Sequence, residues 1–293
     1  MSRTAQPSLY RRARRRLKSL LARTLWAYDG AALAAALRRL GVKPGDTLMV
    51  HASWLADNGF TPSGKGGGPA AFVAALQLAV GPEGLLVMPT MTYHDESSAA
   101  FLARGAVMDV RRSASRMGLL SEVFRRAAGV ERSLSPTHPL AAWGRDTAAF
   151  LAGHEATPAS FGPDSPFARL VARDARILLV DAPFSTITFT HFLEDRIRHS
   201  LAVPFYEAAP VPGQVVDMQG NRLTVPTLVI TEAANAARRE PRLVAALERS
   251  RAIRRARVGN TGLAVIDARA MVETVDRMVA AGDSFFADGK AIT

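Results

Sequence analysis

The chain has 293 residues, a mass of 31.4 kDa and a hydrophobic content of 48%, which suits one large globular domain or two modest ones. It contains no cysteine, which excludes disulfide bonds, thiolate zinc sites and a cysteine nucleophile. No stretch supplies the roughly 18 uncharged apolar residues of a membrane span, and the N-terminus lacks the continuous apolar region of a secretory signal. We therefore expect a cytoplasmic protein.

The net charge of +11 is concentrated in an N-terminal arm. Residues 1–23 hold eight of the 37 basic residues and no acidic one, which leaves 29 basic against 26 acidic residues in the remainder. Apolar residues recur there at helical spacing, which predicts a basic amphipathic helix that lies against the body or makes weak contact with an anionic membrane surface. No nucleic-acid recognition module is present, so we expect no nucleic-acid partner. These patterns divide the chain into a basic arm, residues 1–25, and a single domain, residues 26–293.

Strands and helices alternate along the domain. Asp29 is placed to cap a helix that Gly41 closes. A buried strand at 47–51, an Ala-rich helix at 69–80 and a strand at 85–88 form a strand–helix–strand unit, which predicts a largely parallel sheet with helices on its faces. The later predicted elements are helices 117–127 and 147–154, strand 177–181, a β-hairpin over 211–217 and 222–229, and helices 241–250 and 268–281.

A glycine-rich loop follows the first strand. Residues 59–66 match the phosphate-binding pattern G-x-x-x-x-G-K-[ST] except at the last place, where Gly66 lacks the magnesium-binding hydroxyl. A nucleoside triphosphatase is therefore not expected. The loop can receive a phosphate or an acyl amide chain through backbone N–H groups, or it can be a plain connector. The six histidines form no metal-type cluster, so we expect no metal.

The strongest sign of chemistry is a His-x-x-Glu pair, His191 and Glu194, shortly after the strand at 177–181. Residues three apart on a helix share a face, so the carboxylate can hold one ring nitrogen of the imidazole. That contact raises the basicity of the other nitrogen and favours a general base working near neutral pH. A solvated surface pair has the same spacing, but loops at the carboxyl ends of strands are where α/β proteins build their sites.

Several short segments follow one another along the chain: 49–54 (MVHASW), 66–67 (GG), 79–90 (AVGPEGLLVMPT), 117–126 (MGLLSEVFRR), 129–133 (GVERS), 136–138 (PTH), 161–166 (FGPDSP), 190–194 (THFLE) and 257–260 (RVGN). Their order resembles the aminoglycoside 3-N-acetyltransferase family, a coenzyme A-dependent fold distinct from the larger GNAT group. The resemblance covers about residues 30 to 286. It departs from the family pattern at Ala52, Pro139 and Asp181, where the family has serine, serine and glycine.

The resemblance implies a three-layer α/β/α sandwich around a mixed, largely parallel sheet, with a small hairpin near 211–229. It also implies acetyl-CoA as co-substrate and a small-molecule amine as acceptor, the 3-amino group of an aminoglycoside. His191 would be the general base, Glu194 its orienting partner and Thr190 a donor to the developing oxyanion. The residues expected to bind coenzyme A are His51, Ala52, Ser53, Gly66, Gly67, Ser115, Met117 and Gly118, with Arg111, Arg112 or Arg116 near the phosphates.

An aminoglycoside is a polycation, so carboxylates are expected in the acceptor cleft. The candidates in the matched loops are Asp95, Glu96, Asp164 and Asp181, together with His138 of the P-T-H motif. Two alternatives stay open: an N-acetyltransferase for another amine, such as an amino sugar of an envelope glycan, and a non-catalytic binding protein on the same fold. The sequence predicts no oligomeric state.

Overall fold

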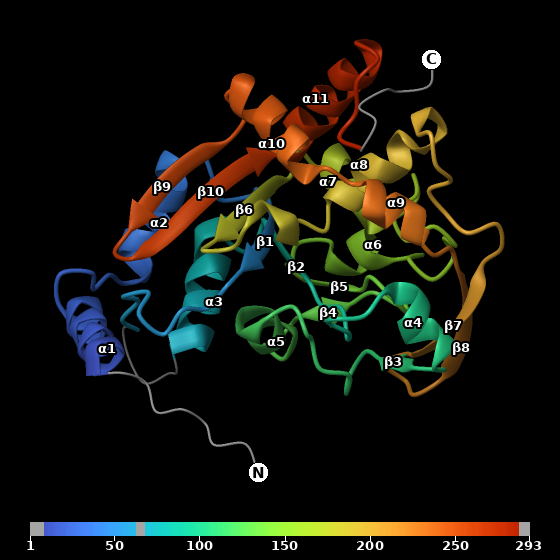
Figure 1. The fold of residues 1–293 in the computed structure, drawn as a ribbon. Coiled ribbons are helices and arrows are strands. Elements are labelled where there is room, and N and C mark those ends of the chain that lie inside the picture. The colour runs from blue at the N-terminus through green and yellow to red at the C-terminus, as the bar shows by residue number, and fades with distance from the viewer. Residues whose placement is uncertain (1–8, 63–67, 287–293) are drawn as a thin grey trace.

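A seven-stranded mixed sheet runs through the molecule (Figure 1). The computed structural model describes residues 9–62 and 68–286; the side chains of residues 9, 11–13 and 15 are outside that description. Three central strands pair in parallel, and the outer pairs are antiparallel, so the sheet is mixed as expected but is parallel only at its centre. In spatial order the strands are β4 (Glu131–Arg132), β5 (Leu140–Gly144), β2 (Leu85–Pro89), β1 (Thr47–Ala52), β6 (Arg176–Val180), β10 (Thr261–Asp267) and β9 (Arg254–Val258).

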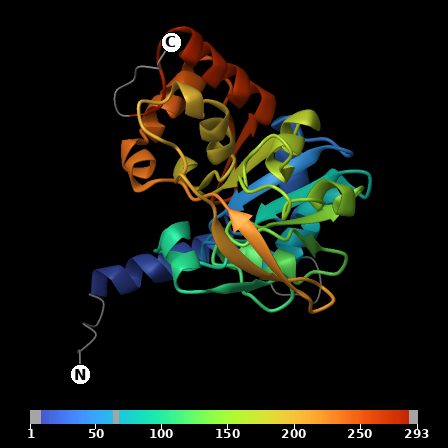
Figure 2. The same cartoon turned by 90° about the vertical axis from the view of Figure 1, so that its right-hand side faces the viewer.

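Helices cover both faces of this sheet, so the mixed α/β sandwich is confirmed (Figures 1 and 2). Side chains alternate along each strand: on β1, Leu48 and Val50 enter one core and Met49 the other. The first core is closed by α2 (Gly30–Arg39), α3 (Gly68–Val80) and α5 (Leu119–Arg125). The second is closed by α6 (Thr147–Leu151), α7 (Pro166–Ala172), α8 (Thr190–Arg196), α9 (Glu232–Ala237), α10 (Glu240–Arg249) and α11 (Ala268–Ala280).

A smaller three-stranded sheet lies beside the main one (Figure 2). The predicted hairpin is confirmed as β7 (Val211–Val216) and β8 (Arg222–Thr227), which pair antiparallel. The short strand β3 (Val107–Asp109), absent from the sequence prediction, joins β7 in parallel. Helix α4 (Ser98–Ala103) packs near this sheet through Phe101 and Leu102. Two short 3₁₀ helices flank α8: η1 (Phe184–Thr186) and η2 (Arg198–Ser200).

The predicted capping of α2 is confirmed, since the Asp29 carboxylate accepts the Ala32 N–H at 2.9 Å. Strands β5, β9 and β10 were not predicted. Strand β9 carries three arginines in five residues. Charged residues are common on edge strands because they discourage pairing with other chains, but they remove the apolar pattern by which a strand is recognised in a sequence. Strand β10 alternates buried and half-buried residues, yet its pairing with β6 depends on a segment about 85 residues away.

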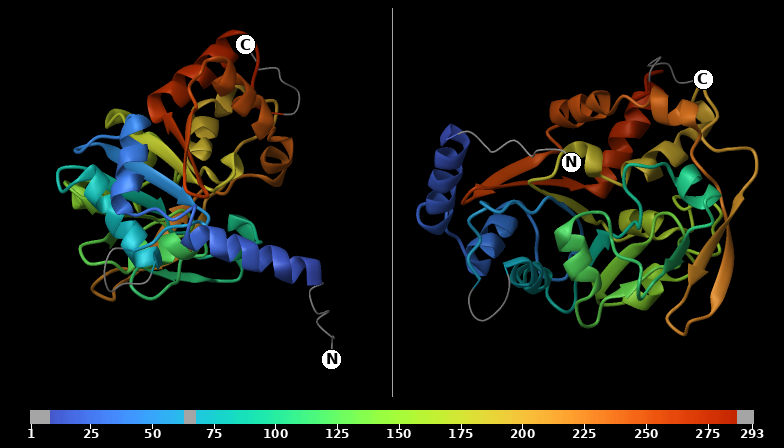
Figure 3. Two further views of the ribbon diagram at one scale, coloured as in Figure 1. Left: turned by 90° about the vertical axis from the view of Figure 1, so that its left-hand side faces the viewer. Right: turned by 60° about the horizontal axis from the view of Figure 1, so that its bottom comes forward.

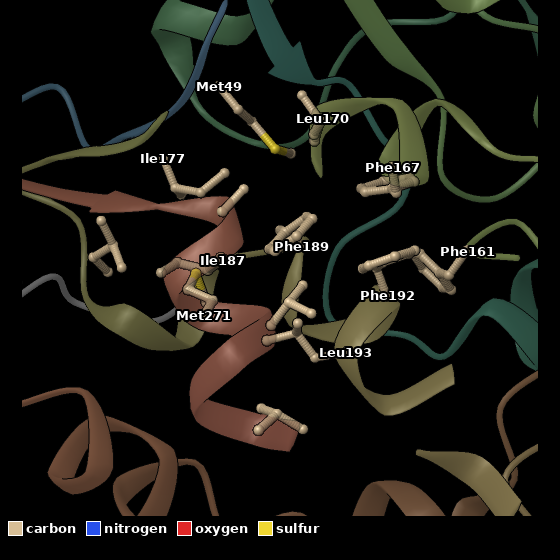
Figure 4. Packing of buried hydrophobic residues seen from close by; sticks show 14 of the residues in the cluster. Met49, Phe161, Phe167, Leu170, Ile177, Ile187, Phe189, Phe192, Leu193 and Met271 are labelled. Atoms are coloured by element: carbon tan, nitrogen blue, oxygen red, sulfur yellow. The ribbon is translucent and has the colours of Figure 1, made fainter. Parts of the chain in front are cut away.

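The core around α8 holds the site residues in place (Figure 4). Phe189 and Leu193 are fully buried and lie beside Met271 of α11. Phe189 stacks on Phe192 with ring centroids 5.3 Å apart. Such interiors are close-packed, so the first turn of α8 has a defined position relative to the sheet.

We expect Ser165→Ala to lower the free energy of unfolding by about 1 kcal/mol, the usual loss for a helix N-cap. Ser165 is fully buried and its hydroxyl accepts the Ala168 N–H at the start of α7. Chemical denaturation measures the change. Ser250→Ala is the control, because this exposed serine only donates to the Leu247 carbonyl at a helix end. Equal stabilities for the two variants would contradict the assignment.

The helix predicted for the basic arm is present as α1 (Leu9–Arg23), but it projects from the body for most of its length (Figure 3). The expectation that it lies against the body is therefore wrong. Its described contacts with the body are near its C-terminal end, where Ala22 is buried and Lys18 pairs with Asp57 at 3.1 Å. Across the described residues, no helix combines the length and hydropathy that a bilayer span requires.

Candidate active site

A pocket of about 450 Å³ opens where the central parallel strands end. It lies at the carboxyl ends of β1 and β2, the position where α/β sheets usually bind ligands. The loop after β6 and the start of α5 form its walls. Among the described residues its lining is Val50, His51, Ala52, Ser53, Met88, Pro89, Met91, His94, Arg116, Met117, Gly118, Ser121, Ala182, Ser185, Thr186, Ile187, Thr188 and His191. A second cavity of similar size, about 460 Å³ between α2 and α3, contains none of the predicted catalytic residues.

His191 and Glu194 meet as the helical spacing predicts. The His191 Nδ1 lies 2.8 Å from Glu194 Oε2, and the Glu194 carboxylate has no exposed surface. An ionised carboxylate only accepts hydrogen bonds, so we assign the proton to Nδ1. The Nε2 of His191 is then the ring nitrogen left for a ligand in the pocket.

Arg238, at the end of α9, holds the other side of the Glu194 carboxylate. Its Nε donates to Oε1 and its Nη2 donates to Oε2 at 2.9 Å, a two-pronged pairing. Nη2 also donates to Asn235 Oδ1 at 3.1 Å. It lies 3.4 Å from His191 Nδ1 as well, but two donors cannot bond each other, so both direct their protons to Glu194.

Glu194 is therefore a buried charge with its partners in place. Burial raises the pKa of a carboxyl group, but the charges and hydrogen bonds of His191 and Arg238 outweigh it and hold the pKa of Glu194 below its ordinary value of 4.5. The carboxylate stays ionised throughout the physiological range. An anion held in this position is able to orient a neighbouring imidazole ring and to stabilise its protonated form.

Aromatic rings surround the imidazole of His191. Phe161 packs against it with ring centroids 5.0 Å apart, and the His138 ring lies 5.9 Å away. His138 is buried between Thr137, whose Oγ1 is 2.9 Å from Nδ1, and Tyr93, whose hydroxyl is 3.2 Å from Nε2. Burial, reinforced by the nearby histidines 191 and 154, lowers the pKa of His138 well below its ordinary value, so this ring is neutral.

His51 also lines the pocket but is more deeply buried than His191. It is 4% exposed, and burial lowers its pKa to about 3 against an opposing effect of the Thr186 backbone. Its Nε2 is buried without a hydrogen-bond partner among the described residues. A buried nitrogen without a hydrogen-bond partner is unfavourable in the free protein. A ligand that forms a hydrogen bond with it would therefore gain binding free energy.

The residues predicted to bind coenzyme A fall into three groups. His51, Ala52, Ser53, Met117 and Gly118 line the pocket together with Arg116. Ser115 lies just behind it, with its hydroxyl 2.8 Å from that of Ser121. Gly66 and Gly67 lie outside the described residues, so their prediction has no structural counterpart.

Gly118 brings two walls of the pocket close together. It has a φ of +110°, a backbone conformation that other residues rarely adopt, and a Cβ atom here would lie 3.3 Å from the Ala52 carbonyl oxygen. The start of α5 thus approaches the end of β1 directly. A side chain at position 118 would therefore crowd the pocket wall at the end of β1.

The predicted acidic residues do not gather in the pocket. Exposed Asp95 contacts its rim through His94 Nδ1, at 2.8 Å, while Glu96 pairs with Arg104 at 2.9 Å. Asp181 accepts the Gly262 N–H at 2.8 Å and borders a different cavity, near Arg257. Burial raises the pKa of Asp181.

Asp164 and Thr190 also stand apart from the pocket lining. The Asp164 side chain is exposed three residues after Phe161, the residue whose ring packs on His191. The Thr190 hydroxyl is buried and donates to the Ile187 carbonyl at 2.7 Å. Because the hydroxyl proton is already used in this hydrogen bond, it is not available to an oxyanion. Within 9–62 and 68–286, no group of three or more His, Asp or Glu side chains is placed to hold a metal ion.

Sequence reasoning missed Arg238, Tyr93 and the contact of Phe161 with His191. Arg238 is 44 residues from Glu194 and lies in an Ala-Ala-Arg-Arg run that shows no pattern of its own. Tyr93 follows the end of β2, so its place after a strand at the pocket edge is a signal that could have been used. Phe161 belongs to the F-G-P-D-S-P segment, but nothing local predicts its partner.

Comparisons with known proteins show which proteins this chain is similar to. The protein-family model described as aminoglycoside 3-N-acetyltransferase matches residues 49–280 of this chain. The aminoglycoside N(3)-acetyltransferase III of Pseudomonas aeruginosa is 32% identical over 188 residues, 60% of this chain and 67% of that protein. The aminoglycoside N(3)-acetyltransferase VII of Streptomyces paromomycinus is 34% identical over 176 residues, 55% of this chain and 58% of that protein. The match thus spans about 58 to 67% of the length of these two relatives.

Solved structures extend the likeness over more of the fold. The aminoglycoside acetyltransferase AAC(3)-Xa aligns with a TM-score of 0.69 and 25% identity, covering 90% of this chain and 95% of that one. The enzyme AAC-VIa, solved with bound sisomicin, aligns with a TM-score of 0.64 and 26% identity, covering 85% and 96%. The matched relatives are acyltransferases by name. With the family match covering well over half of its residues, this chain belongs to the aminoglycoside 3-N-acetyltransferase family.

Proposed function

We propose that this protein transfers an acetyl group from acetyl-CoA to the 3-amino group of an aminoglycoside, with His191 as general base and Glu194 as its orienting partner. The observation that carries the proposal is the His191–Glu194–Arg238 arrangement at the pocket wall. It holds one ring nitrogen and leaves the other for the acceptor amine. Family membership supports the reaction class.

The reaction needs a base because an amine is mostly an ammonium ion at neutral pH and cannot attack a thioester. In the proposed step the amine nitrogen bonds to the thioester carbonyl carbon while His191 Nε2 takes its proton. The C–S bond then breaks, the imidazolium gives its proton to the departing thiolate, and the nitrogen of the new amide loses its second ammonium proton to solvent. Glu194 stabilises the imidazolium between these two events.

The oxyanion formed in this step needs hydrogen-bond donors. Ser53, which lines the pocket, is a better candidate than Thr190, whose hydroxyl already donates to Ile187. Arg116, exposed at the pocket rim, is the arginine best placed for the phosphates of coenzyme A among those that the sequence indicated. His51, whose Nε2 has no described hydrogen-bond partner, and Gly118 line the same pocket and offer contacts for the amide-bearing arm of the co-substrate.

Turnover of acetyl-CoA against a panel of aminoglycosides and mono-amino sugars, read by release of free thiol, tests the proposal. Thiol release that depends on an aminoglycoside supports it. Turnover only with mono-amino sugars would remove aminoglycosides as substrates and leave the acetyltransferase chemistry. No turnover with any amine, despite coenzyme A binding, would favour a binding protein.

Asp164→Asn is expected to raise the KM for the aminoglycoside and to leave the KM for acetyl-CoA unchanged. We propose that this exposed carboxylate, which follows Phe161, makes an ionic contact with the polycation in the ground state, and loss of such a contact weakens binding without slowing chemistry. Steady-state kinetics with each substrate varied in turn measures the effect. Glu155→Gln, at a half-exposed carboxylate on the preceding loop, is the control. Equal KM values in all three proteins would refute the contact.

A further inference from the structure

We propose that α1 is an interfacial helix that attaches this protein to an anionic lipid surface. The helix lies outside residues 49–280, the part matched by the family, so the proposal is independent of the acetyltransfer reaction. Three observations carry it: where α1 is rooted, which side chains it exposes and how its charge is distributed.

The root of α1 is firmly anchored. The Trp26 N–H donates to the Leu21 carbonyl at 2.8 Å, and the chain then passes between Gly59 and Gly259. Both glycines have positive φ, and a Cβ atom on either would lie 2.1 or 2.2 Å from the Trp26 carbonyl oxygen. Two residues on, the buried Tyr28 hydroxyl is 2.7 Å from Thr261 Oγ1. The projecting direction of α1 is therefore built into the body of the protein.

The helix exposes apolar side chains along one side. Tyr10, Leu17 and Leu20 are 75%, 57% and 59% exposed. They are separated by seven and three residues, which places them on a common face. Leu25, just beyond the helix, is 79% exposed. A row of large apolar groups open to water is unfavourable, and such a row marks a surface that a partner covers.

The charge of the arm identifies the partner. The first 23 residues hold eight basic residues, and the first acidic residue of the chain is Asp29. Arg14, Arg16 and Arg23 are exposed, and they flank the apolar face. A helix with a basic face and an apolar face fits the boundary between acidic headgroups and acyl chains. Nucleic acid provides no apolar surface on which the leucines could be buried, and two such basic helices would repel each other, so neither nucleic acid nor a second copy of the helix fits this surface as well.

The test uses the full-length protein in co-sedimentation with vesicles of phosphatidylcholine alone or with added phosphatidylglycerol. Each basic residue near a charged surface strengthens binding about fivefold, so Arg14→Gln/Arg16→Gln should weaken binding to the anionic vesicles roughly 25-fold. Leu17→Ser/Leu20→Ser should weaken it at least as much, because the apolar insertion is lost. Wild-type binding should fall steeply as salt rises from about 0.05 to about 0.5 M.

Matched controls remove the same groups elsewhere. Arg38→Gln/Arg39→Gln deletes two exposed arginines from the end of α2, and Leu78→Ser removes an 80% exposed leucine from α3. Both should bind anionic vesicles as the wild type does. Circular dichroism and thermal unfolding establish that all variants remain folded.

Several results would overturn the proposal. Equal binding to neutral and anionic vesicles, or α1 variants that bind as well as the controls, would do so. So would self-association by sedimentation equilibrium that the leucine variant abolishes while no vesicle binding occurs. Binding to short duplex DNA without binding to vesicles would assign the arm to nucleic acid instead.

Discussion

His191→Ala is expected to lower kcat for acetyl transfer by a factor on the order of 10²–10⁴, the range for removal of a general base. The imidazole lies at the pocket wall, is partly open to ligand, and is backed by a fully buried carboxylate. Alanine cannot accept the proton of the acceptor amine, so the amine stays protonated through the step. Affinity for coenzyme A should change little, because the proposed mechanism places the ring at the reacting centre rather than along the long arm.

Steady-state thiol release measures kcat, and isothermal titration with coenzyme A measures affinity. His199→Ala is the matched control, because His199 is exposed and follows the same helix without reaching the pocket. Full activity in His191→Ala would exclude the mechanism. A large loss in both histidine variants would point to a structural defect around α8 instead.

Glu194→Gln is expected to lower the free energy of unfolding by about 3 kcal/mol, the lower part of the range for breaking a buried ion pair. The carboxylate is fully buried, and its loss leaves the Arg238 guanidinium, 21% exposed, without its anionic partner and with only neutral acceptors such as Asn235 among its described side-chain contacts. The lower part of the range applies because Arg238 reaches solvent. Activity should fall less than in His191→Ala, because the imidazole remains.

The matched pair Arg238→Gln and Arg239→Gln tests which neighbour stabilises the carboxylate. Arg238→Gln removes both charge-assisted bonds to Glu194 and should destabilise the fold clearly. Arg239 is exposed and donates to the carbonyls of Ala236 and Arg238, so its loss should change stability by less than about 0.5 kcal/mol. Equal stabilities would show that Arg238 contributes no more than a surface arginine.

The ion pair between Glu194 and Arg238 also predicts how the stability of the protein depends on pH. Because the folded-state pKa of Glu194 lies below 4.5, its stabilising effect is fully present above that value and is lost as pH falls toward the folded pKa. The stability difference between wild type and Glu194→Gln should therefore narrow below about pH 4.5, by at most about 1.4 kcal/mol per pH unit. A difference that widens on acidification would mean that the carboxyl is protonated in the folded protein.

Local pattern was sufficient for the elements whose cause is local. The capped helix α2, the buried strands β1, β2 and β6 and the hairpin β7–β8 follow from capping residues, apolar runs and turn residues. The His191–Glu194 contact belongs to the same class, because a spacing of three on a helix brings the side chains together without help from the rest of the chain. The family resemblance, carried by motifs in order, led to the fold and the reaction class.

What depends on distant residues was not predictable. Glu194 receives Arg238 from 44 residues away, and His191 receives Phe161 from a separate loop, because packing of α8 and α9 on the sheet brings them together. Asp181 entered the predicted acceptor site by sequence position, yet it bonds to β10, a strand recognisable only once it pairs with β6. The amphipathic character of α1 was written in its sequence, whereas its projection away from the body was decided by the tight passage of Trp26 between Gly59 and Gly259. Spacing along the chain determines contacts within one helix or hairpin, and only the assembled sheet determines which side chains from separate segments share a pocket.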